Sequence, residues 1–139
     1  MNPLNPYVFF DGDCEEAMHF YERVFKVKLE ALIYESAAPG AKPPPAGKPQ
    51  AVMHARLPLY GGALMASDWM ADRPFEKKQG FYVCLNYEST AEARRVYGAL
   101  AEGGRINMPM EKTFFAEAFG MLVDRYGTPW MIMSRPASA

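Results

Sequence analysis

The pattern of hydrophobic and polar positions occurs twice along the chain. In the first copy, an apolar run at residues 7–10 precedes a polar turn and then an apolar stripe at helical spacing. A second copy in the same order begins at Phe81. Each copy continues into short strand-like segments without a second helix. The duplication predicts a single domain, residues 1–139, built from two βαβββ modules over about residues 5–70 and 79–135. The two modules are expected to face each other across a cleft.

The first module is predicted to contain one helix and four strands. The helix begins near Asp13, which has the spacing of a capping box with Glu16. Gly61 and Gly62 predict a tight hairpin turn. The expected strands are residues 7–10, 27–34, 51–60 and 63–68. The proline-rich segment 36–49 predicts no regular structure, and both a flap at the edge of the cleft and simple disorder are consistent with it.

The second module repeats this order with clearer helix boundaries. Ser89 and Glu92 predict a capping box at the start of the helix, and Gly103 and Gly104 predict its end. The expected strands are residues 80–87, 106–111, 119–125 and 129–134. Two helices are too few for an alternating parallel α/β fold, so the predicted class is α+β.

Composition excludes several kinds of partner. Half of the 139 residues are hydrophobic, 14% are aromatic and the net charge is -1. No basic run indicates a nucleic-acid partner, and no apolar stretch is long enough to indicate a membrane span. The start of the chain lacks a signal-peptide pattern, so a cytoplasmic location is expected. Cys14 and Cys84 have neither metal-site nor disulfide-framework spacing.

Several segments together resemble a known superfamily. The chain resembles the vicinal oxygen chelate superfamily of glyoxalases, bleomycin-resistance proteins and dioxygenases, and more narrowly its PhnB-like, or 3-demethylubiquinone methyltransferase-like, branch. The residues that carry the resemblance are Phe9–Ala17 with Phe20 and Tyr21, His54–Ala55, Gly62–Asp68 and Phe119–Ile132. The resemblance implies paired βαβββ modules that form an open glyoxalase-like barrel with a cleft, and a homodimer.

The superfamily usually places a divalent metal in this cleft, on ligands from the first and fourth strands of each module. The corresponding positions in this chain fall on Pro6 or Tyr7, Met65, Phe81 and Met131. None of these side chains suits a hard or borderline divalent cation, which prefers oxygen or imidazole ligands. We therefore predict no cofactor and no metal site at the superfamily's positions. No glycine-rich loop that would cradle S-adenosylmethionine follows a strand.

Strand alternation predicts which side chains line the cleft instead. On the third strand, Val52, His54 and Arg56 share one face, and the apolar set Met53, Ala55 and Leu57 should meet the helix. The predicted lining is apolar and aromatic with two polar groups, a composition typical of small-molecule sites. It consists of His54, Arg56, Met65, Ser67, Phe81, Met108, Met110, Phe114 and Met131.

The polar candidates also have structural interpretations. His54 could contact a ligand, act as a base or bind a metal, or it could pair with Asp68 or Asp124. Arg56 could bind an anionic group or form a surface salt bridge. Asp68 and Asp124 stand at strand ends, where a carboxylate commonly accepts backbone N–H groups.

Three hypotheses follow for the function. The leading one is a metal-independent homodimer that binds a small apolar or aromatic molecule. The second is a lyase, isomerase or dioxygenase relative with a relocated metal on His54, Asp68, Glu111 and Asp124. The third is a dimer that binds a protein partner and has an empty cleft. No catalytic residue can be assigned from the sequence.

Overall fold

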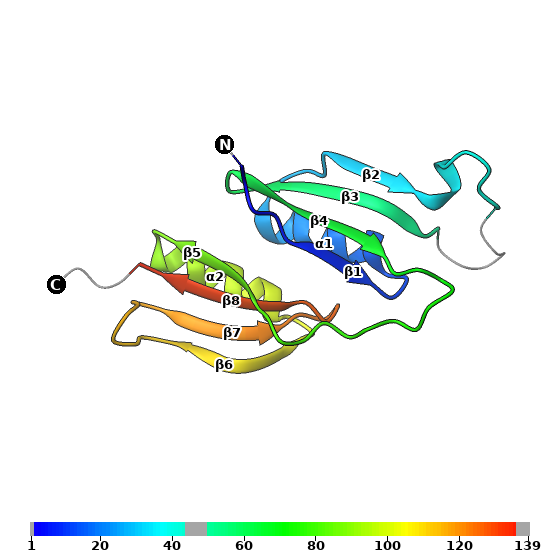
Figure 1. Ribbon diagram of the computed structural model, residues 1–139. Helices are drawn as coiled ribbons and strands as arrows, with labels where there is room; N and C mark the ends of the chain where they lie inside the picture. Colours follow the sequence, from blue (N-terminus) through cyan, green and yellow to red (C-terminus); the bar gives the residue numbers. More distant parts are fainter. Residues whose placement is uncertain (1, 44–49, 136–139) are drawn as a thin grey trace. The chain divides into compact units, whose positions relative to one another are not determined.

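The computed structural model describes residues 2–43 and 50–135. The chain divides into two compact units, Met1–Glu76 and Lys77–Ala139. Over these described residues, each unit contains one α-helix and one four-stranded sheet (Figure 1). The predicted α+β class with paired βαβββ modules is therefore confirmed.

The first unit has strand order β1-β4-β3-β2. The central pair β3 and β4 is antiparallel, as is β2 with β3, whereas β1 lies parallel to β4. Its elements are β1 (Tyr7–Phe10), α1 (Cys14–Phe25), β2 (Ala31–Tyr34), the short 3₁₀ helix η1 (Glu35–Ala37), β3 (Val52–Leu59) and β4 (Gly62–Asp68).

The second unit repeats this topology with strand order β5-β8-β7-β6. Strand β5 lies parallel to β8, and the other neighbours are antiparallel. Its elements are β5 (Val83–Tyr87), α2 (Thr90–Ala101), β6 (Arg105–Glu111), β7 (Phe119–Val123) and β8 (Pro129–Ser134).

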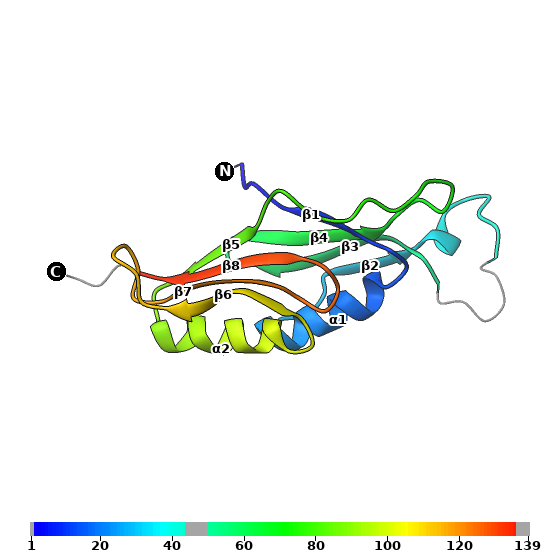
Figure 2. The same ribbon diagram turned by 90° about the horizontal axis from the view of Figure 1, so that it is seen from below.

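Each helix covers one face of its own sheet (Figure 2). In unit one, Met18 and Tyr21 of α1 are fully buried, as is Leu57 of β3. In unit two, Leu100 of α2 and Trp130 of β8 are buried in the same way. Alternate residues of the strands point to the opposite side. Each sheet therefore has a helix face, which forms the core, and an open face.

The first helix is capped by a residue distant in the sequence. Asp13 is the N-cap residue but makes no side-chain cap hydrogen bond, so the predicted Asp13–Glu16 capping box is wrong. The Asp68 carboxylate, at the end of β4, accepts the Cys14 N–H at 3.0 Å instead. The prediction for α2 is confirmed, because the Ser89 side chain accepts the Glu92 N–H.

Strand β2 is shorter than the pattern at 27–34 predicts. Lys26 ends α1 in the left-handed conformation. The Leu29 N–H then donates to the Glu22 carboxylate at 2.6 Å, so the backbone here is still bound to the helix. Pairing with β3 begins only where the Glu30 N–H donates to the Arg56 carbonyl.

A bulge shifts the alternation of β3. Ile33 pairs with His54, but Tyr34 pairs with Val52, so Met53 is the extra residue. Val52 is therefore buried on the helix face with Ala55 and Leu57, while Met53 is 42% exposed. The prediction that Val52 shares a face with His54 is wrong, and so is the one that sends Met53 to the helix.

Other boundaries differ by a few residues from the predicted ones. Strand β5 begins at Val83, so Phe81 precedes the strand, and β7 ends at Val123. The start of the proline-rich segment contains η1. Residues 44–49 of the predicted flap lie outside the described residues.

Candidate functional site

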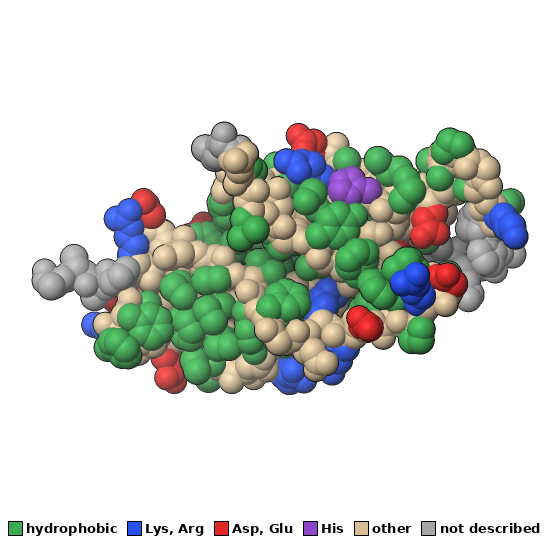
Figure 3. Space-filling view, in the orientation of Figure 1, with side chains coloured by type: hydrophobic (Ala, Val, Ile, Leu, Met, Phe, Trp, Pro, Cys, Tyr) green, Lys and Arg blue, Asp and Glu red, His purple; other side chains and the backbone are tan. Residues whose placement is uncertain are grey.

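The open face of the first sheet carries a run of aromatic rings. Val8 and Phe10 of β1 are buried, whereas Tyr7 and Phe9 are 40% and 36% exposed. The Tyr7 and Phe9 ring centroids are 5.2 Å apart, and Trp69 meets Phe9 edge-on at 5.1 Å. Figure 3 shows this side of the strands, with a histidine side chain among hydrophobic ones. These rings form an accessible apolar surface, which we call the ring platform and define as Tyr7, Phe9 and Trp69.

His54 joins one end of the ring platform. Its Nδ1 lies 3.0 Å from the Tyr7 hydroxyl, and its ring centroid is 5.7 Å from that of Tyr7. The alternative in which His54 pairs with Asp68 or Asp124 is wrong, because the partner of its Nδ1 is Tyr7. The bulge at Met53 leaves His54 on the open face, as predicted. A phenol and an imidazole therefore form one hydrogen-bonded pair beside the aromatic rings.

Tyr7 keeps its hydroxyl proton at neutral pH. The pKa of the Tyr7 phenol is raised above its ordinary value of 10.0, first by partial desolvation and then by the electrostatic effect of Cys14, while a hydrogen bond with the Ser67 side chain opposes the increase. Tyrosine is a neutral hydrogen-bond donor at any pH below its pKa. The hydroxyl is therefore available to donate to the imidazole.

Arg56 lies two residues beyond His54 and is already paired. Its Nε donates to the Glu30 carboxylate at 2.6 Å, in a partly exposed ion pair. Its Nη1 lies 3.6 Å from the sulfur of Met65. Met65 stands between Tyr7 and Arg56 in the strand register. The positive charge of Arg56 is therefore largely compensated before any ligand arrives.

Ser67 contributes little polarity to the open face. The side chain is buried, and its hydroxyl lies within hydrogen-bonding distance of the Val52 and Asp68 carbonyl oxygens. A hydroxyl that donates to the backbone is not free to donate to a ligand. At the predicted site, Ser67 therefore acts as a small side chain and not as a hydrogen-bond donor to a ligand.

The two strand-end aspartates serve the backbone. The oxygens of Asp68 accept the N–H groups of Cys14 and Val52, at 3.0 and 2.8 Å. Asp124 accepts the N–H groups of Tyr126 and Thr128 with one oxygen. Its other oxygen accepts the indole N–H of Trp130. Both side chains are buried, which confirms the capping interpretation of these residues.

The open face of the second sheet carries a row of sulfur-containing side chains. Cys84 pairs with Met131, Met131 with Met121, and Met121 with Met108, and we call these four residues the sulfur row. Their alternate neighbours, such as Trp130 and Leu122, are fully buried on the helix face. Partial desolvation raises the pKa of the Cys84 thiol, although the residue is exposed. Thioethers and a thiol are polarisable and adaptable, so this row suits apolar contacts of varied shape.

The aromatic residues predicted in unit two lie outside its regular strands. Phe81 precedes β5 and is 45% exposed. Phe114 is fully exposed and meets Phe115 edge-on, and Phe115 in turn meets Phe119. The Thr113 hydroxyl accepts the backbone N–H of Phe115, so a local turn presents these rings. Met110 is half-buried on β6.

Four residues of these faces lie outside the predicted lining, namely Phe9, Trp69, Cys84 and Met121. Tyr7 entered the sequence predictions only as a position that corresponds to a metal ligand. The alternation of buried and exposed residues in Tyr7–Phe10 could have identified Phe9, since an amphipathic strand exposes every second side chain. The in-register row around Met121 needs the strand pairing, which the sequence does not supply.

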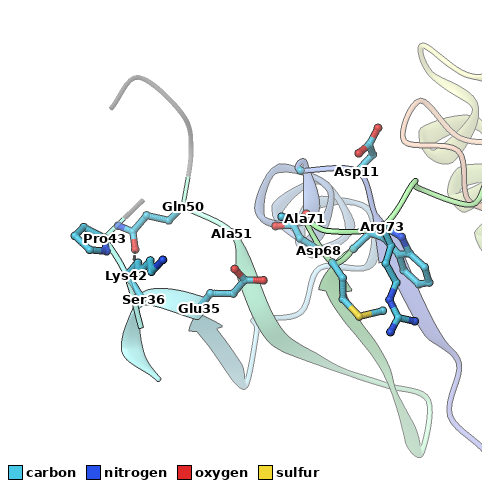
Figure 4. Close-up of a pocket in the computed structure, with 13 residues that line it drawn as sticks. Asp11, Glu35, Ser36, Lys42, Pro43, Gln50, Ala51, Asp68, Ala71 and Arg73 are labelled. Carbon is cyan, nitrogen blue, oxygen red and sulfur yellow. Dashed lines mark hydrogen bonds between the residues drawn. The ribbon is translucent and has the colours of Figure 1, made fainter. Parts of the chain in front are cut away.

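A pocket of about 430 Å³ lies at the end of the first sheet (Figure 4). Figure 4 shows Glu35, Ser36 and Lys42 on one side and Asp11 and Arg73 on the other. The Ser36 hydroxyl donates to the Gln50 side chain at 2.8 Å. The described part of the proline-rich segment therefore borders this pocket.

Within the described residues, no group of three or more His, Cys, Asp and Glu side chains is arranged to hold a metal ion. The relocated site would need both Asp68 and Asp124, whose oxygens are occupied by N–H donors. The groups that these faces present are thus mainly aromatic rings, thioethers and an imidazole.

Comparison with known proteins places the chain in a family. The family model described as 3-demethylubiquinone-9 3-methyltransferase matches residues 2–133. Protein YjdN of Escherichia coli K12 is 33% identical over 138 residues, which cover 94% of this chain and 93% of YjdN. This chain belongs to the PhnB-like family. The predicted resemblance to that branch is confirmed.

Solved structures agree with the PhnB-like assignment. Protein PA1353 from Pseudomonas aeruginosa is 40% identical with a TM-score of 0.88, over 98% of this chain and 99% of that one. The PhnB protein from Bacillus cereus is 28% identical with a TM-score of 0.76, over 96% and 99% of the two chains. A glyoxalase/bleomycin resistance/dioxygenase domain from Frankia sp. EAN1pec shares the fold at 13% identity and a TM-score of 0.63, over 97% and 96%. The PhnB-like chain thus has the glyoxalase-type fold. Among the described residues, no helix has the length and hydropathy to span a membrane.

Proposed function

We propose that this protein binds a small apolar or aromatic molecule, without requiring a metal, on the open faces of its sheets. The observation that carries the proposal is the ring platform of Tyr7, Phe9 and Trp69, which stays accessible beside the Tyr7–His54 pair. Apolar walls with a few placed polar groups are typical of small-molecule sites. The sulfur row of the second sheet adds a second apolar surface of the same kind.

The turns between strand and helix favour binding over methyl transfer. The family description names a methyltransferase. A dinucleotide or S-adenosylmethionine is commonly held by a glycine-rich turn that opens a helix. Here the turn after β1 is Asp11-Gly12-Asp13 and the turn after β5 is Glu88-Ser89, so together they contain a single glycine.

A binding screen tests the proposal. The intact protein is mixed with a panel of aromatic and heterocyclic compounds, and its melting temperature is measured in the presence and absence of chelator. A ligand at 100 times its Kd should stabilise the protein by about 2.7 kcal/mol. We expect hits that persist in chelator and weaken in Phe9→Ala. If no compound shifts the melting temperature, the proposal fails.

The relocated-metal hypothesis has its own test. Elemental analysis of protein purified without chelator, followed by zinc and nickel titration, measures the metal content. A stoichiometric metal that is lost in His54→Ala would favour the enzyme over the binding protein. We expect no such metal, because the carboxylates of Asp68 and Asp124 are engaged by the backbone.

We also propose that the protein is a homodimer. The support is the number of apolar side chains exposed in unit two, among them Ile106, Met108 and Phe114. Figure 3 shows hydrophobic side chains gathered over the strands of that unit. Patches of this kind commonly mark interaction surfaces.

A further inference from the structure

The Tyr7–His54 pair determines which hydrogen-bonding group the ring platform offers to a ligand. We infer that this face takes a planar aromatic molecule with a carbonyl or carboxylate oxygen on its rim, and that the oxygen accepts a hydrogen bond from Nε2–H of His54. This inference rests on the proposed function and adds to it the chemical class of the ligand.

With the Tyr7 hydroxyl as donor to Nδ1 of His54, the proton of the neutral imidazole lies on Nε2. Tyr7 keeps its hydroxyl proton at neutral pH, and the hydroxyl lies 3.0 Å from Nδ1 of His54. When the neutral imidazole accepts this bond at Nδ1, its single proton must sit on Nε2. An imidazolium would carry a proton on Nε2 as well. In both states the outer nitrogen is a donor.

The outer nitrogen remains available. Nε2 of His54 makes no hydrogen bond or ion pair with any residue that the structure describes, and the side chain is partly exposed. The bulge at Met53 keeps His54 on the same face as Tyr7 and Met65. The donor thus stands at the rim of an aromatic surface, where an oxygen on a stacked ring would meet it.

The ring platform accounts for the aromatic part of the ligand. Neighbouring rings have centroids 5.1 to 5.7 Å apart, from His54 through Tyr7 and Phe9 to Trp69. This spacing is normal for aromatic pairs and leaves a continuous apolar surface. Arg56 is held by Glu30 and does not by itself demand an anion. A neutral carbonyl therefore satisfies the site as well as a carboxylate does.

The same geometry argues against His54 as a general base. A base needs a bare nitrogen facing the proton that it removes. With Tyr7 as the donor, its hydroxyl occupies the bare nitrogen Nδ1, and Nε2 carries the proton. His54 therefore recognises an acceptor rather than abstracting a proton.

The first experiment reads the proton directly. Long-range ¹H–¹⁵N correlation spectra of the intact protein at neutral to mildly alkaline pH distinguish a protonated Nε2 from a protonated Nδ1. We expect the Nε2–H form for His54 in the wild type and a mixture of both forms in Tyr7→Phe. A dominant Nδ1–H form in the wild type would overturn the inference, whether or not any ligand binds.

The second experiment uses two probes of matched shape. 2-Acetylnaphthalene carries a carbonyl where 2-ethylnaphthalene carries a methylene, and ligand-observed NMR measures the Kd of each. One hydrogen bond should favour the carbonyl probe by about five- to tenfold. His54→Phe should abolish the preference, and His54→Gln should restore part of it, because the amide can donate in place of Nε2–H.

The outcomes separate this inference from the function on which it rests. If neither probe binds the wild type, the proposed function loses its support. If both bind equally and both weaken in Phe9→Ala, the ring platform binds apolar molecules but the acceptor-oxygen inference is wrong. A carbonyl preference that survives in His54→Phe also overturns the inference. 2-Naphthoate, as a third probe, shows whether a carboxylate binds as well as the neutral carbonyl does.

Discussion

Asp68 and Asp124 use their carboxylates to hold the backbone where the chain reverses. Asp68 joins the end of β4 to the start of α1 and the start of β3. Asp124 closes the turn between β7 and β8. Buried carboxylates that accept N–H bonds stabilise the fold, because an unpaired N–H group is costly inside a protein. These acidic residues are thus structural, and the polar group left for a ligand is His54.

Removing the Asp68 carboxylate should destabilise the protein strongly. In Asp68→Ala, the buried N–H groups of Cys14 and Val52 lose their acceptor, at roughly 1–3 kcal/mol each. We expect a loss of about 3 kcal/mol in the free energy of unfolding, measured by urea denaturation. Asp11→Ala is the matched control, since Asp11 is exposed, and it should change stability by less than about 0.5 kcal/mol. Equal effects of the two substitutions would contradict this role of Asp68.

Glu22 should make stability depend on pH in the acid range. Hydrogen bonds from His19 first, and then from the Leu29 N–H, lower the pKa of Glu22 below its ordinary value of 4.5. A lowered folded-state pKa gives stability that is present above the unfolded-state pKa and is lost as pH falls through the folded-state pKa. The stability difference between wild type and Glu22→Gln should therefore be present above about pH 4.5 and shrink as the pH falls below it.

Urea denaturation at pH 3.5, 5.5 and 7 measures this difference. Glu16→Gln is the control, because Glu16 is exposed on the same helix and its difference from wild type should vary less with pH. A Glu22→Gln difference that grows on acidification would show that the pKa of Glu22 is not lowered in the folded protein.

At the scale of the elements, the predictions succeeded wherever local pattern decides the structure. The helical spacing of apolar residues correctly predicted both helices, and Ser89 caps α2 as its spacing with Glu92 indicates. They failed where a distant residue decides. The acceptor at the start of α1 comes from Asp68, and the face of Val52 depends on a bulge opposite β2. The candidate site divides in the same way, since the exposure of Phe9 follows from alternation but the partner of His54 does not.

Two glycines of the second unit should respond oppositely to alanine. A Cβ on Gly104 would lie 2.3 Å from the Val123 carbonyl oxygen, so the backbone between α2 and β6 would have to move. A Cβ on Gly98, within α2, would meet no atom within 4 Å. We expect Gly104→Ala to destabilise by about 1–3 kcal/mol and Gly98→Ala to stabilise by about 0.5–1 kcal/mol. Thermal and urea unfolding measure both, and a stable Gly104→Ala protein would contradict the close approach.

At the scale of the whole molecule, duplication leaves two sheets that each bury one face only. The helices cover the faces of Leu57 and Trp130, and the opposite faces carry the ring platform and the sulfur row. Exposed apolar faces favour either a bound ligand or a second copy of the chain, because either one would remove apolar surface from water.

The proposed homodimer should weaken when charge enters the exposed apolar surface of unit two. Met108 on β6 is 43% exposed and pairs with Met121 on the open face, so Met108→Lys should leave the fold intact but place an ammonium group in the proposed interface. A standard interface buries about 800 Å² per partner, and an unpaired charge buried within it costs several kcal/mol. We expect light scattering to give twice the monomer mass of 15.6 kDa for the wild type and a concentration-dependent mixture for Met108→Lys. Leu4→Lys, at a position 98% exposed before β1, is the control and should remain dimeric. A wild-type protein that is monomeric at all concentrations would refute the dimer, and the open faces would then have to be covered by ligand or by a different protein.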